Sequence, residues 1–176
     1  APDHGHGLPH APAEPRGACP LSQGGFDDRT ALRAAATRFV ETAWRQRDLA
    51  ALSGFVHPEY RHALVGRTTD LSFEGYRKFL ATVQEAFDSL VLAVLDTVAE
   101  DDEVALHLVL GGRHVKPLFG IAARGAEGRL DVMTRLVFAD RRVWRQYSVT
   151  DFATLSARMR GPGPSSRMAP PDAGGT

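Results

Sequence analysis

Two stretches of the sequence decide the fold class: LVLAVLDTVAEDDEVALHLVLGG at residues 90–112 and RLDVMTRLVFADRRVWRQYSVT at residues 129–150. Each is rich in Val, Leu and aromatic residues, and each is divided by a short charged interruption, Asp101-Asp102 or Asp140-Arg141. Apolar runs joined by so few residues are typical of β-hairpins. The sequence therefore predicts antiparallel strands at 90–99, 103–112, 129–139 and 142–150.

The residues before these strands have helical periodicity. From Leu32 to Trp44 apolar residues recur at the spacing of an amphipathic helix, and Asp28 is suited to cap it. A shorter helix is expected at 49–56, before His57-Pro58, and another at 72–87. Residues 57–62 are expected to lie in the connection between these two helices. Helices followed by an antiparallel sheet predict an α+β domain in which the helices cover one face of a curved sheet around an apolar pocket.

Composition and chain ends indicate one domain. The chain has 176 residues, of which 43% are hydrophobic, enough for a single core. Residues 1–25 and 161–176 are rich in Pro and Gly and poor in large apolar residues. We therefore expect flexible segments at both ends and a working domain at 26–160.

Charge and cysteine content limit the partners. The 21 basic and 21 acidic residues give a formal net charge of zero, which argues against nucleic acid and against an anionic membrane surface. Cys19 is the one cysteine in the chain, so neither a disulfide framework nor a thiolate cluster is expected. No apolar run approaches the roughly 20 residues of a membrane span, and a cytoplasmic location is expected.

Nucleotide-binding glycine motifs, the H-E-x-x-H zinc motif and the G-x-S-x-G serine motif are absent from the sequence. His4, His6 and His10 have no carboxylate or thiolate support in their Pro/Gly-rich segment. We therefore predict neither a metal nor a cofactor.

Four stretches, in order, resemble one family. Gly112-Arg113-His114 with Phe119-Gly120-Ile121 and Gly125 is similar to the G-T-H … F-x-G-I-x-x-T-G segment of the SnoaL-like polyketide cyclases, within the nuclear-transport-factor-2-like superfamily. Residues 57–62 resemble that family's P-D-Y-x-x-H, residues 75–88 its G-x-x-x-x-x-L … A-F-P-D helix, and residues 140–151 its closing strand. The sequence departs from the pattern at Gln146, where the family has His, and at Arg141, where it has Gly.

The resemblance implies a cone-shaped α+β barrel, with a mainly antiparallel sheet closed by three N-terminal helices around a deep pocket. It also implies that Asp151, at the end of the last strand, is the acid/base residue. Burial of a carboxyl in an apolar pocket would support that role by raising its pKa. The alternative is that Asp151 only caps a final helix that begins at Phe152.

Strand alternation selects the other candidates. On a regular strand Val143, Arg145, Tyr147, Val149 and Asp151 share a face, so Tyr147 should line the pocket with Asp151 and stabilise an enolate, unless it is a core aromatic residue. His107 and His114 fall on opposite faces, and the resemblance favours His114 as the third catalytic candidate.

The remaining candidates are assigned to substrate binding. Asp131, Met133 and Arg135 are spaced by two residues and so share one face of a regular strand. This spacing is expected either for an ion pair of Asp131 and Arg135 in the pocket or for a solvent-exposed face. The predicted substrate-binding residues are His62, Tyr60, Trp44, Phe119, Met133, Arg135 and His107.

The leading hypothesis is a cofactor-free enzyme of specialised metabolism that closes a ring in a polyketide-like substrate, by acid/base aldol chemistry or by shape-directed pericyclic closure. An isomerase or epoxide hydrolase of the same fold is the second hypothesis, in which Asp151 and Asp131 supply the acid/base groups if Asp131 faces inward. A non-catalytic binding or dimerisation module is the third. An exposed sheet face would favour a homodimer.

Overall fold

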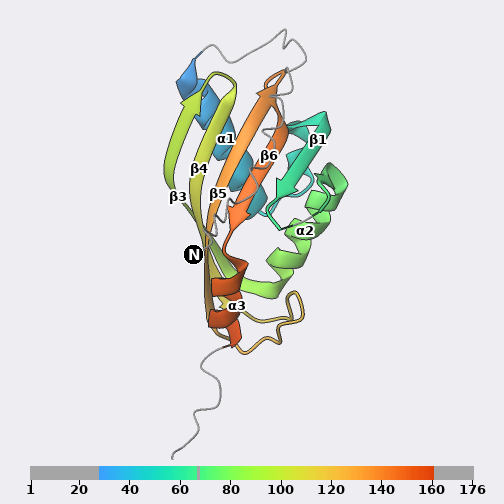
Figure 1. Ribbon diagram of the computed structural model, residues 1–176, viewed down its shortest axis with the longest axis vertical. Coiled ribbons are helices and arrows are strands. Elements are labelled where there is room, and N and C mark those ends of the chain that lie inside the picture. The colour runs from blue at the N-terminus through green and yellow to red at the C-terminus, as the bar shows by residue number, and fades with distance from the viewer. Residues whose placement is uncertain (1–27, 67, 161–176) are drawn as a thin grey trace, which may run out of the picture.

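The computed structural model describes residues 28–66 and 68–160 (Figure 1). The elements in chain order are α1 (Arg29–Trp44), the 3₁₀ helix η1 (Ala51–Gly54), β1 (Val56–Leu64), β2 (Leu71–Ser72), α2 (Phe73–Ala86), β3 (Phe87–Glu100), β4 (Glu103–His114), β5 (Glu127–Ala139), β6 (Arg142–Thr150) and α3 (Phe152–Arg160). The flexible segments predicted at 1–25 and 161–176 lie outside the described residues.

The strands form one six-stranded sheet in the order β2-β1-β6-β5-β4-β3. All neighbouring strands pair antiparallel except β1 and β6, which are parallel. The α+β class is confirmed, and the sheet is mainly antiparallel as predicted. It curves but does not close into a barrel, because β2 and β3 remain at its two edges.

The four strands predicted from the apolar runs are confirmed, and so are both hairpin turns. Asp140 and Arg141 have φ values of 49° and 59°, the left-handed pair that suits a two-residue hairpin between twisted strands. β1 was missed, because residues 57–62 were assigned to a connection between helices. Its partner β6 lies more than 80 residues away, and such long-range parallel pairing leaves no local signal.

Helices cover the concave face of the sheet. α1 begins where the Asp28 carboxylate accepts a hydrogen bond from the Ala31 amide at 2.6 Å, and α2 begins at Ser72, whose hydroxyl accepts from Gly75 at 3.2 Å. α1 packs on β3 and β4, α2 lies against β1, β2 and β3, and α3 packs on β5 (Figure 1). The predicted 49–56 helix is a single short 3₁₀ turn. In the part of the chain that the structure describes, no helix is long and apolar enough to be a membrane span.

A β-bulge in β6 decides which side chains face the helices. On β5, Val137 and Phe138 are consecutive, yet they pair with Arg145 and Val143, so Trp144 is an extra residue on β6. An extra residue reverses the alternation of side chains beyond it. Val143 therefore faces inward, and the inward positions that follow it are 146, 148 and 150.

Candidate functional site

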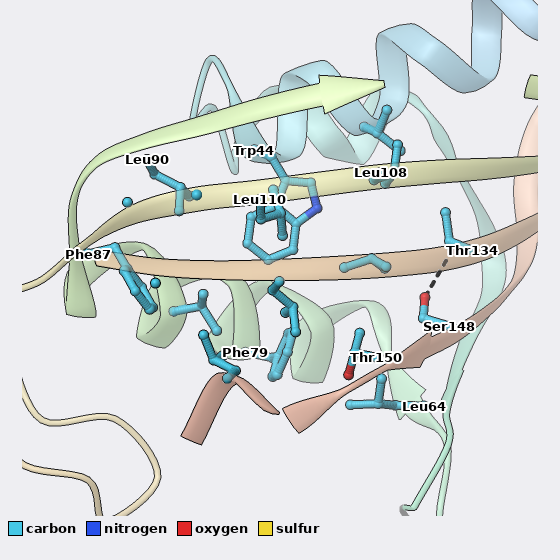
Figure 2. Close-up of a pocket in the computed structure, with 18 of the residues that line it drawn as sticks. Trp44, Leu64, Phe79, Phe87, Leu90, Leu108, Leu110, Thr134, Ser148 and Thr150 are labelled. Carbon is cyan, nitrogen blue, oxygen red and sulfur yellow. Dashed lines mark hydrogen bonds between the residues drawn. The ribbon is translucent and has the colours of Figure 1, made fainter. Parts of the chain in front are cut away.

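A cavity lies between the concave face of the sheet, α1 and α2 (Figure 2). Most of its wall is aliphatic or aromatic, and Trp44, at the end of α1, projects toward its middle. The lining residues used below are Trp44, His62, Tyr76, Phe79, Phe87, Leu118, Thr134, Gln146, Ser148 and Thr150.

The cavity is narrow. The empty space between the lining atoms is about 740 Å³, including the part open to solvent, but the centre of a water molecule can occupy only about 50 Å³ of it. One water needs roughly 10–15 Å³ by this measure, so the space holds a few waters. A ligand of drug size therefore requires lining side chains to move, or it extends beyond the mouth.

One wall of the cavity carries a connected polar network from β1, β5 and β6. The Ser148 hydroxyl lies 3.0 Å from His62 Nε2. It also lies 2.9 Å from the Thr134 hydroxyl, as Figure 2 shows. The Gln146 amide donates to both hydroxyls at 3.3 Å. Because these groups are buried and hydrogen-bonded to one another, they fix the His62 ring and its orientation in the wall.

Two buried tyrosines adjoin this network, Tyr60 behind the wall and Tyr76 in the cavity lining. Tyr60 donates its hydroxyl hydrogen to Gln146 Oε1 at 2.6 Å. Burial raises the pKa of Tyr60 well above its usual range, and the nearby Tyr76 raises it further. Burial also raises the pKa of Tyr76, an effect that its hydrogen bond with Gln146 partly offsets. Both phenols therefore stay neutral donors at physiological pH.

Thr150 ends the polar wall at the last inward position of β6. Its hydroxyl oxygen is buried and has no hydrogen-bond partner among the described residues. A buried polar atom without a partner is uncommon in folded proteins, and a ligand or water at the cavity would satisfy it.

Several predicted site residues lie at the cavity. Trp44 and His62 line it, and Tyr60 lies behind it through its bond to Gln146. Phe119 lies on the loop between β4 and β5, where its ring stacks on Phe79 at 6.2 Å. Their placement agrees with substrate binding, which stays a prediction.

The expected placement of Tyr147 and Asp151 is wrong. Neither lines the cavity, because the bulge at Trp144 turns Tyr147 to the outer face, where Arg135 lies 4.5 Å from the centre of its ring. Asp151 is exposed, just before α3, and its carbonyl accepts from the Leu155 amide. A catalytic role for either residue stays a prediction, and this geometry does not support it.

The two histidines of β4 lie on opposite faces, as predicted. His114 faces inward and is fully buried, with its ring 5.5 Å from that of Phe87, a cavity residue. Both ring nitrogens lack a hydrogen-bond partner among the described residues. His107 faces outward and pairs with Asp131 at 3.3 Å.

Met133 and Arg135 also lie on the outer face of the sheet. Of the two alternatives for Asp131 and Arg135, the solvated face is therefore confirmed, and the predicted placement of Met133 and Arg135 in the pocket is wrong. Met133 is half exposed, and Arg135 pairs with Glu103 at 3.0 Å. Asp131 is exposed, and the hydrogen bond from Arg129 is the main cause that lowers its pKa. The outer face therefore carries charged pairs among apolar side chains.

The sequence reasoning missed most of the polar residues that line the cavity: Tyr76, Thr134, Gln146, Ser148 and Thr150. A signal for Thr134 was present, because charged residues at 129, 131 and 135 alternate with apolar ones and place 130, 132, 134 and 136 inward. The residues of β6 had no such signal, since their direction depends on the bulge.

Metal ligands do not gather at the cavity. Within 28–66 and 68–160 no group of three or more His, Cys, Asp or Glu side chains is arranged to hold a metal ion. The predicted absence of a metal site at His4, His6 and His10 concerns residues outside the described ones.

Comparison with known proteins identifies the fold and the family. No curated protein matches this chain in sequence. Solved structures with the same fold include AclR of Streptomyces galilaeus (23% identity, 77% of this chain and 89% of that chain, TM-score 0.69), TsrD of Streptomyces laurentii (24%, 76% and 97%, 0.66) and IdmH of Streptomyces antibioticus (21%, 72% and 96%, 0.65). The family model described as SnoaL-like polyketide cyclase matches residues 34–159, and the chain therefore belongs to the SnoaL-like polyketide cyclase family.

Proposed function

We propose that the protein is an enzyme that closes a ring in a polyketide-like substrate, with His62 as the group that removes and returns the proton. The observation that carries this proposal is the cavity itself: its walls are apolar, and its polar side holds one histidine fixed by Ser148. Among the described lining residues, His62 and Tyr76 are the titratable ones. Imidazole is the side chain best suited to exchange protons near neutral pH, whereas burial keeps the Tyr76 phenol protonated.

The ring closure is an intramolecular aldol addition. His62 takes the proton from a carbon between two carbonyl groups, and the carbanion forms a bond to the carbon of a third carbonyl group, farther along the same chain. The new alkoxide then receives the proton from the imidazolium, so the step is balanced without another reactant. Thr150 supports the enolate oxygen, because its buried hydroxyl lies at the cavity and has no hydrogen-bond partner among the described residues.

Shape contributes to the rate as well. A narrow apolar cavity holds one flexible chain with its reactive carbons close together, which supplies an effective concentration that solution lacks. Neither a cofactor nor a metal enters this scheme. The alternative of epoxide hydrolysis by Asp151 with Asp131 loses its geometric basis, because Asp131 lies on the outer face and Asp151 does not line the cavity.

Proton exchange tests the proposal without knowledge of the natural ring. The probe is ethyl benzoylacetate, an aryl β-keto ester, in deuterated buffer, with loss of the proton between its carbonyl groups followed by NMR. General acid/base catalysis contributes roughly 10²–10⁴-fold, so His62→Gln is expected to remove most of the protein-dependent exchange. Ser148→Ala is expected to reduce it less, because Ser148 positions the ring.

The rival assignments give different results in the same assay. Loss of exchange with Asp151→Asn and retention with His62→Gln would transfer the role to Asp151. Binding of the probe without any exchange would favour the binding module. Circular dichroism and thermal melting of each variant exclude unfolding as the cause.

We also propose that the protein is a homodimer through the outer face of the sheet. Val98, Met133 and Val149 are exposed there, each by more than half. They lie beside the pairs of Arg135 with Glu103 and of His107 with Asp131. Interspersed positive and negative side chains around apolar ones suit a surface that meets its own copy across a two-fold axis.

A further inference from the structure

The Gln146 side chain is held in one orientation on the polar side of the cavity. Its Oε1 accepts the hydroxyl hydrogen of Tyr60 at 2.6 Å, and burial keeps that phenol protonated. The amide nitrogen donates instead to the Thr134 and Ser148 hydroxyls, at 3.3 Å each. The family pattern has His at position 146, and a neutral imidazole has one hydrogen to donate, whereas the amide has two. Each hydroxyl therefore accepts from Gln146 and keeps its own hydrogen for another partner.

The remaining contacts fix where those two hydroxyl hydrogens go. The backbone carbonyl of Tyr147 can only accept, so Thr134 supplies the hydrogen of the 3.2 Å bond between them. Ser148 then supplies the hydrogen of the 2.9 Å bond between the two hydroxyls. With its one hydrogen used, Ser148 can only accept from His62 Nε2, which lies 3.0 Å away. All of these hydrogen bonds form together only if His62 carries its proton on Nε2.

The opposite direction leaves one hydrogen bond unmade. If Ser148 donated to His62, Thr134 would have to donate to Ser148, and the bond to the Tyr147 carbonyl would be lost. The side chains of His62, Thr134 and Ser148 are buried, so bulk water does not replace a lost partner. One hydrogen bond corresponds to roughly a 2- to 10-fold change in an equilibrium, and the wall favours the Nε2-protonated ring by that factor.

We propose that Thr134 is a positioning residue: through Ser148 it holds neutral His62 with its proton on Nε2, and Nδ1 is the nitrogen that takes the proton from the substrate. This inference rests on the proposed function, since it assumes that His62 is the acid/base residue. The Nε2 hydrogen stays bonded to Ser148 while Nδ1 gains and returns a proton, so no hydrogen of the wall changes partner during the reaction. A donor and acceptor arrangement that is already in place costs no reorganisation at the moment of proton transfer.

Nitrogen NMR of the ¹⁵N-labelled protein tests the assignment, because a protonated and a bare imidazole nitrogen have well-separated chemical shifts. The His62 signals are those absent from His62→Gln, and they are compared at a pH at which they show a neutral ring. Thr134→Val keeps the shape of the side chain and removes its hydroxyl, after which both forms of the ring make the same hydrogen bonds with Ser148. The ratio of Nε2-protonated to Nδ1-protonated ring is therefore expected to fall roughly 2- to 10-fold.

Two further variants separate this effect from a general change in the wall. Thr134→Ser restores the hydroxyl and is expected to restore the ratio. Thr150→Val is the matched control, because it removes a hydroxyl of the same wall that is not hydrogen-bonded to the other described residues, and it leaves the ratio unchanged. Exchange of the β-keto ester by Thr134→Val is expected to fall in proportion to the remaining fraction of Nε2-protonated ring.

The results distinguish this inference from the proposed function. A ring protonated mainly on Nδ1 in the unmodified protein, or an unchanged ratio in Thr134→Val, refutes the inference while the exchange assay with His62→Gln still stands. A shift of equal size in Thr150→Val also refutes the role of Thr134. If the ratio responds as expected but His62→Gln keeps the exchange, the direction of the hydrogen bonds is supported, and the role of Nδ1 is refuted together with the proposed function.

Discussion

Replacement of His114 by leucine is expected to stabilise the protein, which few substitutions of a fully buried residue do. The imidazole is 0% exposed, and neither ring nitrogen has a hydrogen-bond partner among the described residues. Its ring lies 5.5 Å from that of Phe87. The protein therefore bears the desolvation cost of a polar ring without the compensating bonds.

The size of the effect follows from these contacts. A buried polar group left unsatisfied costs about 1–3 kcal/mol. Leucine has a similar size and no polar atom, but it gives up the ring contact with Phe87, worth roughly 0.5–1.5 kcal/mol. The midpoints of these two ranges differ by about 1 kcal/mol, so His114→Leu is expected to gain about 1 kcal/mol, or roughly 2–4 °C in melting temperature for a protein of this size.

Urea unfolding at pH 8 measures the free energy of unfolding directly. His107→Leu is the matched control: it removes a histidine of the same strand that is partly exposed and pairs with Asp131, and a change within about 0.5 kcal/mol is expected. A loss of more than about 1 kcal/mol in His114→Leu would refute the reasoning, since it would mean that the imidazole is hydrogen-bonded in solution, for example to a buried water.

The same variant separates stability from function. Proteins keep a destabilising polar residue where activity depends on it. If His114→Leu gains stability and loses exchange activity, His114 takes part in ligand recognition, as its position beside Phe87 permits. If it gains stability and keeps activity, the histidine has no role in the reaction.

Three further predictions concern the tyrosines and the outer face. Tyr60→Phe leaves Gln146 Oε1 without its 2.6 Å donor and is expected to lower the free energy of unfolding in urea by about 1–3 kcal/mol. An unchanged free energy of unfolding would mean that another donor replaces the Tyr60 hydroxyl. Because burial raises the pKa of Tyr60 and of Tyr76 in the folded protein, their contribution to stability is complete below the ordinary value of about 10 and is lost as the pH rises above it. Native protein should accordingly show little ionisation of these two residues by absorbance at 295 nm until it unfolds, and early ionisation would contradict their burial. Met133→Glu places like charges across the proposed two-fold axis and is expected to give monomers in analytical ultracentrifugation. The control Val65→Glu changes an exposed residue away from the proposed interface and leaves the dimer intact. A monomeric parent protein would refute the interface.

The sequence by itself determined the elements with strong local patterns. The long apolar runs divided by Asp101-Asp102 and Asp140-Arg141 specify two hairpins, and the apolar spacing from Leu32 specifies the first helix. Each of these depends on neighbours in the chain, so periodicity and turn chemistry are enough to find it. Motifs in order along the chain also pointed to the family, which the family model confirms.

Only the tertiary structure decided which side chains meet in the cavity. The extra residue at Trp144 reverses the alternation along β6, so Gln146, Ser148 and Thr150 face inward, and Tyr147 faces outward. The bulge occurs where β6 pairs with both β1 and β5, and that pairing depends on segments distant in the chain. A shift by one residue exchanges the two faces of a strand, so an error too small to affect the fold assignment was large enough to misplace the site.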